Sequence, residues 1–577
     1  MTTKLSLFAD NRASPESRSY AFGATSSNNR QVLIVGAGPT GLVAAIEVAR
    51  RGVPCRIIDR LPMRSQNEIE GAKRLRQSRA IAVQARTLEC FEMMGIDVDA
   101  FIASGQPIRA VNISVSTRKR IARIEFDRLP TRYPYMLLIP QHETEQMLER
   151  HLVRMGLRVE HDKELVGFEQ GDDGVMCEVR DGNGKCELSK AAWLLGCDGA
   201  HSTTRHLLGA SFEGSSYQSA FMIADVVLGT AFERSEMHVF TTGYGPIAFF
   251  PMRSGMWRIV ADNPPADWGD EPTLDQCQSL VDQRAPTRVT LRDPRWLARV
   301  RIHRRTTPHM QVKRVFLLGD AAHIHSPGGG QGTNTGIQDA FNLAWKLAWA
   351  PNNPNAPLIA SYEPERQPVA EGVVRLSDRL TRLVTLRNPV ARLLRNIVWP
   401  ALSASRAVRL RSGLVLSELA IGYAKSPIVE EHPVKGGLQA GSRASDGLLQ
   451  NGDTSTRIYG LIASGKYTLL VFVDEPEPES VQQIVDRTVA GFSELVAVAI
   501  IASTSSGRGH HHVFTDPSGA TIQQYGAGRA CLVRPDGYIG FCSSIADAGV
   551  LLPRHLARVL GGARTPTIPV HPAFAVS

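Results

Sequence analysis

Three glycines near the start of the chain, at positions 36, 38 and 41, have a spacing suited to binding phosphate. They stand in "VGAGPTG", between an apolar strand-like run and a helical pattern that continues to about residue 51. At such a junction the first glycine makes a tight turn, the second lets a pyrophosphate approach the backbone, and the third lets the helix pack on the strand. Free N–H groups and the helix dipole then favour the phosphate charge. The residues assigned to this cradle are Gly36, Gly38, Pro39, Thr40 and Gly41.

An acidic residue follows at the spacing that a bound nucleotide requires. A second short strand, 54–58, ends in Asp59 with Arg60 beside it. A carboxylate about twenty residues after the glycines can accept hydrogen bonds from ribose hydroxyls. Strand, glycine turn, helix, second strand and acid together predict a bound adenosine diphosphate moiety. This pattern alone leaves both NAD and FAD open.

Two later stretches decide between those cofactors. "WLLGCDGAHSTTRHLLG", at 193–209, is an apolar strand closed by Asp198, and "VFLLGDAAHIHSPGGGQGTNTG", at 315–336, is a strand ended by Asp320 and followed by a glycine loop and a helix. Together with the first fingerprint these resemble the single-component FAD-dependent aromatic hydroxylases, in the branch of phenol hydroxylase. Further blocks in family order extend the resemblance over roughly 30–370, namely "SRAIAVQARTLECFE", "PQHETEQMLERHL" and "SYEPERQPVA".

The resemblance implies roles for individual positions. Asp320 would bind ribityl or ribose hydroxyls, the glycine loop would press its backbone against the flavin ring, and the positive end of the following helix would stabilise negative charge on the reduced ring. Asp198 and Arg205 would contact FAD and the approach of the nicotinamide. As alternatives, either aspartate could cap a helix or end a strand, and Arg205 could be a surface salt-bridge residue. The further positions implied are Arg79, Gln141, Pro327, Gly330, Gly332, Thr333 and Asn334.

The implied reaction uses FAD as cofactor and NADPH or NADH as co-substrate. It hydroxylates a phenolic or polyketide-type aromatic with O2 through a flavin C4a-hydroperoxide. Baeyer–Villiger or other oxygenation on the same scaffold stays open, and so does a flavin-binding protein without turnover. We assign no catalytic residue, because Ile81 stands where phenol hydroxylase carries an aspartate. His323 and His325 are interpreted as loop packing or hydrogen-bonding residues, and no metal is expected because ligand spacing is lacking.

The strand and helix patterns around these residues predict an α/β protein. The resemblance implies an FAD-binding Rossmann-like domain of the glutathione-reductase type, an inserted substrate domain and a C-terminal thioredoxin-like domain. Strand-length runs between 210 and 301 favour a mostly antiparallel sheet, where Tyr244, Phe249 and Met252 are candidates for lining the substrate pocket. The expected boundaries are a disordered leader at 1–29, a first segment of the FAD domain at 30–209, the substrate domain at 210–301, a second segment of the FAD domain with a helical region at 302–431, and the C-terminal domain at 432–577.

Composition limits the partners and the compartment. The chain has 577 residues and a net charge of +9, and nine arginines against one acid lie between 373 and 412. A solvated helix face is the favoured interpretation of that segment, with a membrane surface or an acidic partner as the alternative. The eight cysteines form no CxxC pair, which indicates a reducing, cytoplasmic setting and no redox role for the C-terminal domain. We expect no transmembrane segment and no nucleic-acid partner, and the resemblance implies a homodimer.

Overall fold

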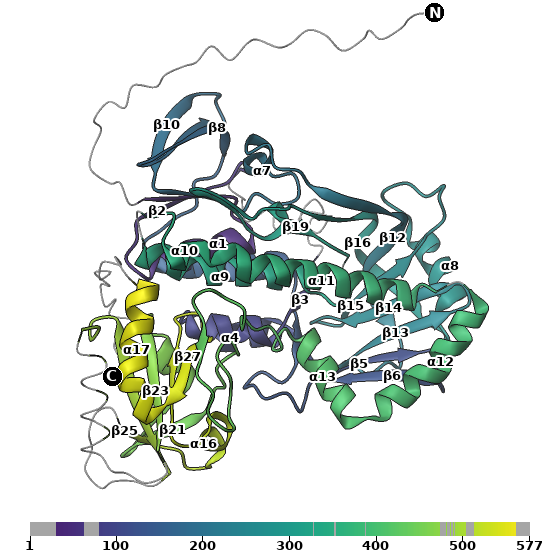
Figure 1. Ribbon diagram of the computed structural model, residues 1–577. Helices are drawn as coiled ribbons and strands as arrows, with labels where there is room; N and C mark the ends of the chain where they lie inside the picture. Colours follow the sequence, from purple (N-terminus) through teal and green to yellow (C-terminus); the bar gives the residue numbers. More distant parts are fainter. Residues whose placement is uncertain are drawn as a thin grey trace, which may run out of the picture.

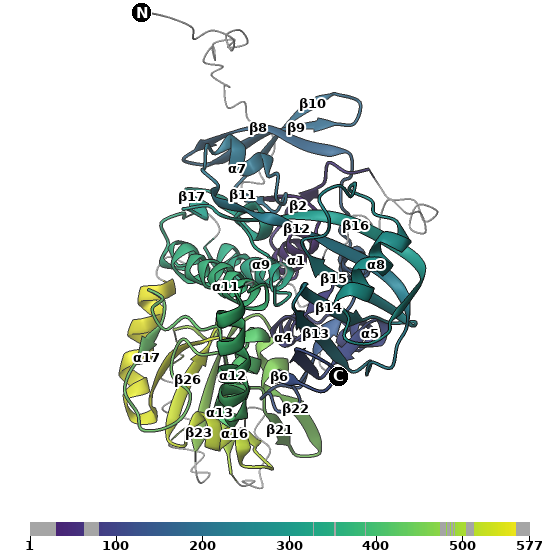
Figure 2. The same ribbon diagram turned by 90° about the vertical axis from the view of Figure 1, so that its right-hand side faces the viewer.

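The computed structural model describes residues 31–62, 80–326, 328–350, 353–386, 388–473, 491–503 and 513–560, together with Val481, Val485 and Val489. The predicted leader, Arg79 and Pro327 lie outside these residues. Figures 1 and 2 show a first sheet with its helices, a second large sheet beside it, and a C-terminal unit against the ends of the central helices.

The first sheet brings the predicted motifs to one edge. Its order is β17-β18-β11-β1-β2, and all neighbours are parallel except β17 and β18. The carboxyl ends of the three central strands therefore meet, and each is followed by one of the predicted motifs. The elements are β1 Val32–Val35, β2 Cys55–Ile58, β11 Trp193–Gly196, β17 Gln311–Val312, β18 Val315–Leu317, α1 Pro39–Ala49, α7 Thr203–Leu207, the 3-10 turn η1 Gly319–Ala321 and α9 Gly332–Trp349.

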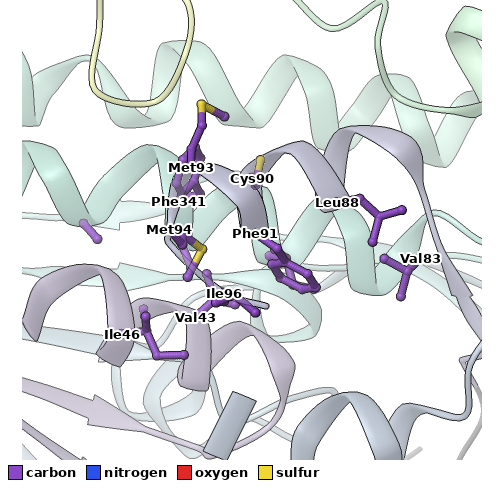
Figure 3. Close-up of a cluster of buried hydrophobic side chains, with 14 of the residues drawn as sticks. Val43, Ile46, Val83, Leu88, Cys90, Phe91, Met93, Met94, Ile96 and Phe341 are labelled. Atoms are coloured by element: carbon purple, nitrogen blue, oxygen red, sulfur yellow. The ribbon is translucent and has the colours of Figure 1, made fainter. Parts of the chain in front are cut away.

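Smaller elements complete this unit. Two three-stranded sheets have the orders β10-β9-β8 and β3-β7-β4. Figure 3 shows side chains of α1, α4 and α9 in one buried cluster, with Val43 and Ile46 on α1, Phe91 on α4 and Phe341 on α9. The elements are β3 Ala82–Val83, β4 Gln106–Ile108, β7 Met136–Leu138, β8 Lys163–Gly171, β9 Gly174–Asp181, β10 Cys186–Ala191, α4 Ala85–Met93, α5 Val98–Ser104 and α6 Gln141–Arg154.

The second large sheet confirms the mostly antiparallel pairing predicted for 210–301. Its order is β19-β16-β12-β15-β14-β13-β5-β6, and only β13 and β5 pair in parallel. Strands β5 and β6 come from before the predicted range. Helix α8, started by a capping box of Thr273 and Gln276, packs against this sheet. The elements are β5 Ala110–Ser114, β6 Arg120–Glu125, β12 Glu213–Gly229, β13 Glu236–Thr242, β14 Gly245–Pro251, β15 Met256–Asp262, β16 Thr290–Thr306, β19 His323–Ile324 and α8 Leu274–Arg284.

A run of helices leads from the first unit to the last. Helix α11 lies beside α9 and reaches the second sheet, and α12 and α13 then lie against β6 (Figure 1). Among the described residues no helix has the length and apolar character needed to cross a membrane. The helices are α10 Pro357–Ala360, α11 Tyr362–Val384, α12 Pro389–Ala404 and α13 Arg406–Leu416.

The C-terminal unit is an eight-stranded mixed sheet in the order β20-β27-β26-β23-β24-β25-β21-β22. Strands β26 and β27 pair in antiparallel fashion and are joined by a turn. Cys531 and Cys542 are buried cross-strand neighbours and are not disulfide-bonded. The elements are β20 Glu430–Glu431, β21 Leu448–Asn451, β22 Thr454–Arg457, β23 Tyr467–Val473, β24 Val496–Ala502, β25 Val513–Thr515, β26 Arg529–Val533, β27 Ile539–Ser544, α14 Ile458–Ile462, α16 Ala520–Tyr525 and α17 Ile545–Leu560.

A buried ionic cluster fastens this unit to the helices that pack on the first sheet. Glu365 on α11 accepts hydrogen bonds from Arg534 at 2.6 and 2.9 Å and from Lys346 on α9 at 2.8 Å. All three side chains are fully buried. Because an unpaired buried charge is strongly destabilising, these partners depend on one another.

Candidate functional site

A cavity of about 260 Å³ opens at the carboxyl ends of β1 and β11. Six predicted cofactor residues line it, and so do polar side chains that sequence reasoning missed, including Lys163 and His201. The structure thus brings the first fingerprint and the Asp198 motif to one space, although they are far apart in the sequence. The six predicted residues are Gly36, Gly38, Asp59, Arg60, Gln141 and Asp198.

The three fingerprint glycines differ in what surrounds them. Gly36 has a φ of 102°, and a Cβ placed on it would lie 2.4 Å from the carbonyl oxygen of Cys197. A Cβ on Gly41 would lie 1.9 Å from the carbonyl oxygen of Gly36. Around a Cβ on Gly38, by contrast, no described atom lies within 4 Å. Close packing therefore requires glycine at positions 36 and 41, whereas Gly38 faces open space in the cavity.

The N-terminus of α1 is free to bind an anion. Gly38 is its N-cap, no described side chain caps it, and Pro39 occupies the first turn. The first N–H groups of such a helix have no partner within the helix. The hydroxyl of Thr40 lies 2.5 Å from a Cβ placed on Gly336 and thus packs α1 against α9, while the contact of Thr40 with a cofactor stays a prediction.

Asp59 holds the turn and faces the cavity. One carboxylate oxygen accepts the Ala37 N–H at 2.6 Å, and the other accepts the Leu61 N–H at 2.8 Å. Each oxygen keeps a lone pair for a further donor. The predicted bond to a ribose is compatible with this placement.

Asp198 and Arg205 both serve the local fold. Asp198 accepts the Ser202 hydroxyl at 2.5 Å and the Thr204 N–H at 2.9 Å, so the capping alternative is confirmed while the residue also lines the cavity. Arg205 is buried and donates to the carbonyls of Ala321 at 2.8 Å and Ala200 at 3.0 Å. The surface salt-bridge interpretation of Arg205 is therefore wrong, because this guanidinium ties α7 to the turn after β18.

Asp320 lies in that turn and is exposed. It is not among the residues that line the described cavity, so its contact with a cofactor stays a prediction. Beneath the turn, Asp339 accepts bonds from the Gly319 N–H at 3.0 Å and from Arg366 at 2.7 Å, and it pairs with His323 at 2.8 Å. The hydrogen-bonding role expected for His323 is confirmed, and the described residues contain no cluster able to hold a metal ion.

Protein neighbours crowd the glycine loop after β19. Gly330 has a φ of 64°, and a Cβ on it would lie 2.7 Å from the Cβ of Ala82. The Asn334 side chain accepts the Gln84 N–H and donates to the carbonyls of Ala82 and Gly330, each within 2.9 Å. Packing against β3 thus explains the glycine at position 330 without reference to the flavin.

The helix after this loop has a free positive end. Helix α9 begins at Gly332 with Thr333 half-buried beside it, and no described side chain caps it. Near Gly332 lies the Nε2 atom of His325, which is buried and has no hydrogen-bond partner among the described residues. Burial lowers the pKa of His325 to about 4, so the ring is neutral near pH 7 and Nε2 can accept a hydrogen bond.

A buried carboxyl that sequence reasoning missed supports the same helix. Glu418 has a φ of 62° and accepts bonds from the side chains of Thr335 and Gln338 in the first turns of α9. Burial raises the pKa of Glu418 to about 8. Nothing in the local sequence announces this contact, because Glu418 follows α13 far along the chain.

The three candidates for the substrate pocket lie in different surroundings. Tyr244 is 66% exposed at the turn between β13 and β14, so it lines no enclosed pocket. Phe249 is fully buried in an aromatic cluster on the side of the sheet that α8 covers. Met252 is buried in the main core. The neighbouring Phe250 points to the opposite face from Phe249 and is half-buried against that core, which makes it the better candidate.

The residues present fit FAD. Two uncapped helix N-termini, an open glycine and a cavity-facing carboxylate are suited to its phosphates, ribose and ring.

Comparison with known proteins agrees with this fit. Residues 29–377 match the family described as FAD binding domain, and residues 438–563 match the family described as aromatic-ring hydroxylase, C-terminal. The chain is 34% identical to the 6-methylpretetramide 4-monooxygenase of Streptomyces rimosus over 88% of this chain and 90% of that protein. It is 30% identical to the pentachlorophenol 4-monooxygenase of Sphingobium chlorophenolicum over 91% of this chain and 96% of that one. A solved anhydrotetracycline hydroxylase from Streptomyces rimosus is 28% identical, with a TM-score of 0.72 over 92% of this chain and 99% of that chain.

Proposed function

The chain belongs to the FAD-dependent aromatic-ring hydroxylases and is a monooxygenase, and from this we propose that it uses NADPH or NADH and O2 to hydroxylate a phenolic or polyketide-type aromatic. The observation that carries the proposal is the open space at Gly38, in a cavity lined by Asp59 and Gln141. The relatives named for tetracycline-type and chlorinated phenolic substrates support the substrate class.

In this proposal the residues of the chain hold and orient FAD. The α1 N-terminus and Gly38 bind the pyrophosphate, Asp59 binds a ribose, and Asp320 binds the ribityl chain or a ribose. When bound, FAD supplies hydride acceptance and activation of O2. The positive end of α9 stabilises the negative charge that a reduced flavin carries, a contribution of about 0.3–2 kcal/mol from the dipole.

The chain must also orient the aromatic and keep water out. Phe250 supplies an apolar surface for the aromatic. We propose that His325 Nε2 accepts a hydrogen bond from a molecule bound next to the glycine loop. Ile81 is buried. Because its side chain has no ionisable group, this position supplies no base. A Baeyer–Villiger outcome would be recognised by insertion of oxygen into a ring bond of the product.

We extend the proposal to the domains. The parallel sheet supports a Rossmann-like FAD domain of the glutathione-reductase type, formed by 30–209 and 302–431 around a substrate domain at 210–301. The mixed sheet of residues 432–577 supports a thioredoxin-like fold. A homodimer is proposed from the family resemblance, and sedimentation velocity of the purified chain tests it.

The test of function is oxidation of NADH and NADPH by the FAD-loaded protein across simple phenols and fused-ring phenolic polyketides, with hydrogen peroxide measured in parallel. A true substrate accelerates oxidation many-fold with little peroxide. If no compound stimulates oxidation with either nucleotide while FAD stays bound, the proposal fails.

A further inference from the structure

Helix α12 carries an apolar stripe that faces solvent. Its large apolar side chains recur at the spacing of one helical face, and each is between 48% and 65% exposed. Other large apolar residues exposed among the described residues are mostly scattered, as is normal for a soluble protein. The α12 stripe consists of Val390, Leu393, Leu394, Ile397, Val398 and Leu402.

The opposite side of α12 attaches the helix to the protein. Arg395 is the one buried residue within this helix, and it donates to the Leu383 carbonyl and the Thr241 hydroxyl, each at 3.0 Å. Trp399 packs against the main core. Contacts on the opposite side therefore hold the helix in place, and the stripe is left available for a partner.

The two helices at the stripe carry charge of one sign, and one of their arginines, Arg409, lies 3.7 Å from Glu125 on β6. Helices α12 and α13 contain five arginines and no aspartate, glutamate or lysine. Arg406 and Arg411 are exposed. A second copy of the chain docked on the stripe by two-fold symmetry would bring these like charges together, whereas an anionic surface would complement them.

We propose that the α12 stripe docks on the surface of an anionic lipid membrane. The apolar side chains enter the boundary between headgroups and acyl chains, and the flanking arginines bind lipid phosphates. The exposed Tyr244 stands in the turn beside α12, because the Arg392 guanidinium lies 3.7 Å from a Cβ placed on the adjacent Gly243. Tyrosine is favoured at this depth of a membrane. The association is peripheral.

The docking helices lead directly to the proposed flavin site. At the end of α13, a side-chain carbon of Leu416 lies 3.1 Å from a Cβ placed on Gly329, and Gln331 donates to the Val415 carbonyl at 3.2 Å. If the proposed function holds, docking places the glycine loop close to a lipid phase in which apolar aromatics dissolve. The docking itself is independent of that function.

Vesicle binding by the full FAD-loaded chain tests the proposal. Vesicles of phosphatidylcholine alone are compared with vesicles of phosphatidylcholine and phosphatidylglycerol, at low and high salt. We expect binding to the anionic vesicles only, and weaker binding at high salt because salt screens the arginines.

Two pairs of substitutions, each with a matched control, locate the contact. L393Q/I397Q removes apolar contacts and should weaken binding at least about tenfold, while L188Q/V550Q, at exposed apolar positions elsewhere, should leave it unchanged. R406Q/R411Q should weaken binding about fivefold for each arginine, and R292Q/R295Q, on exposed parts of β16, should weaken it much less.

Either of two results overturns the proposal. The first is a vesicle result that lacks the expected specificity: the wild-type chain does not bind anionic vesicles, or the control pairs weaken binding as much as the stripe pairs. The other is that sedimentation velocity finds a dimer which L393Q/I397Q dissolves while vesicles bind nothing, since the stripe is then an interface between copies.

Discussion

Replacing Gly38 by alanine should weaken FAD binding without harming the fold. The backbone at Gly38 has φ −71° and ψ −179°, which alanine adopts without strain, and no described atom lies within 4 Å of the new Cβ. The methyl group would fill the space through which we expect the pyrophosphate to reach the α1 N–H groups. Losing one charge-assisted hydrogen bond costs about 1.5–3 kcal/mol, so the Kd for FAD should rise roughly ten- to hundredfold.

Equilibrium titration of the apoprotein with FAD, followed by flavin fluorescence, measures this change. Gly372→Ala is the matched control: it lies within α11 with open space around its Cβ, and it should leave the Kd unchanged. Gly41→Ala should differ from both by also lowering stability, because its Cβ would lie 1.9 Å from a carbonyl oxygen. A Kd at the wild-type value for Gly38→Ala would refute the assignment of this cavity to the pyrophosphate.

Three further predictions concern the buried groups. Glu365→Gln should lower the free energy of unfolding by about 3–5 kcal/mol, because Arg534 and Lys346 lose their shared carboxylate; urea denaturation checks this, and a loss below about 1 kcal/mol would contradict it. Burial raises the pKa of Glu418 to about 8 from 4.5, so the stability of the wild type should fall as pH rises between those values. Glu418→Gln should remove this dependence, so at pH 9 the free energy of unfolding of the variant should exceed that of the wild type by up to about 5 kcal/mol. Parallel pH profiles of stability for the two proteins would contradict this prediction. Phe249→Ala should lower stability by about 3–5 kcal/mol, whereas Phe250→Ala should mainly raise the KM for the aromatic, and thermal melts with steady-state kinetics separate the two outcomes.

The nucleotide fingerprint was predictable because its signal is local. Gly41 and Asp59 each act on neighbours within one strand–helix–strand unit, so residue type and spacing define their geometry. The packing of Gly36 against Cys197 joins two distant segments and was not visible in this way. The capping role of Asp198 was also visible, since Ser202 and Thr204 follow within a few residues.

Contacts between distant segments were not predictable in the same way. A strand pattern shows that Phe249 and Phe250 face opposite sides, but tertiary packing decides which side α8 covers. Glu418 reaches α9 only through the path of α13. For Tyr244 a usable signal existed, because Gly243 and Gly245 around it favour a hairpin turn over a pocket wall.

The most direct test of the central claim follows the oxygen atom. The FAD-loaded protein, NADPH or NADH, and the aromatic that best stimulates oxidation are incubated under isotopically heavy dioxygen, and the product is examined by mass spectrometry. The account predicts one heavy oxygen atom in the product, attached to a ring carbon, with nucleotide consumed in equal amount. Nucleotide oxidation that yields only hydrogen peroxide, or a product whose new oxygen comes from water, would contradict it.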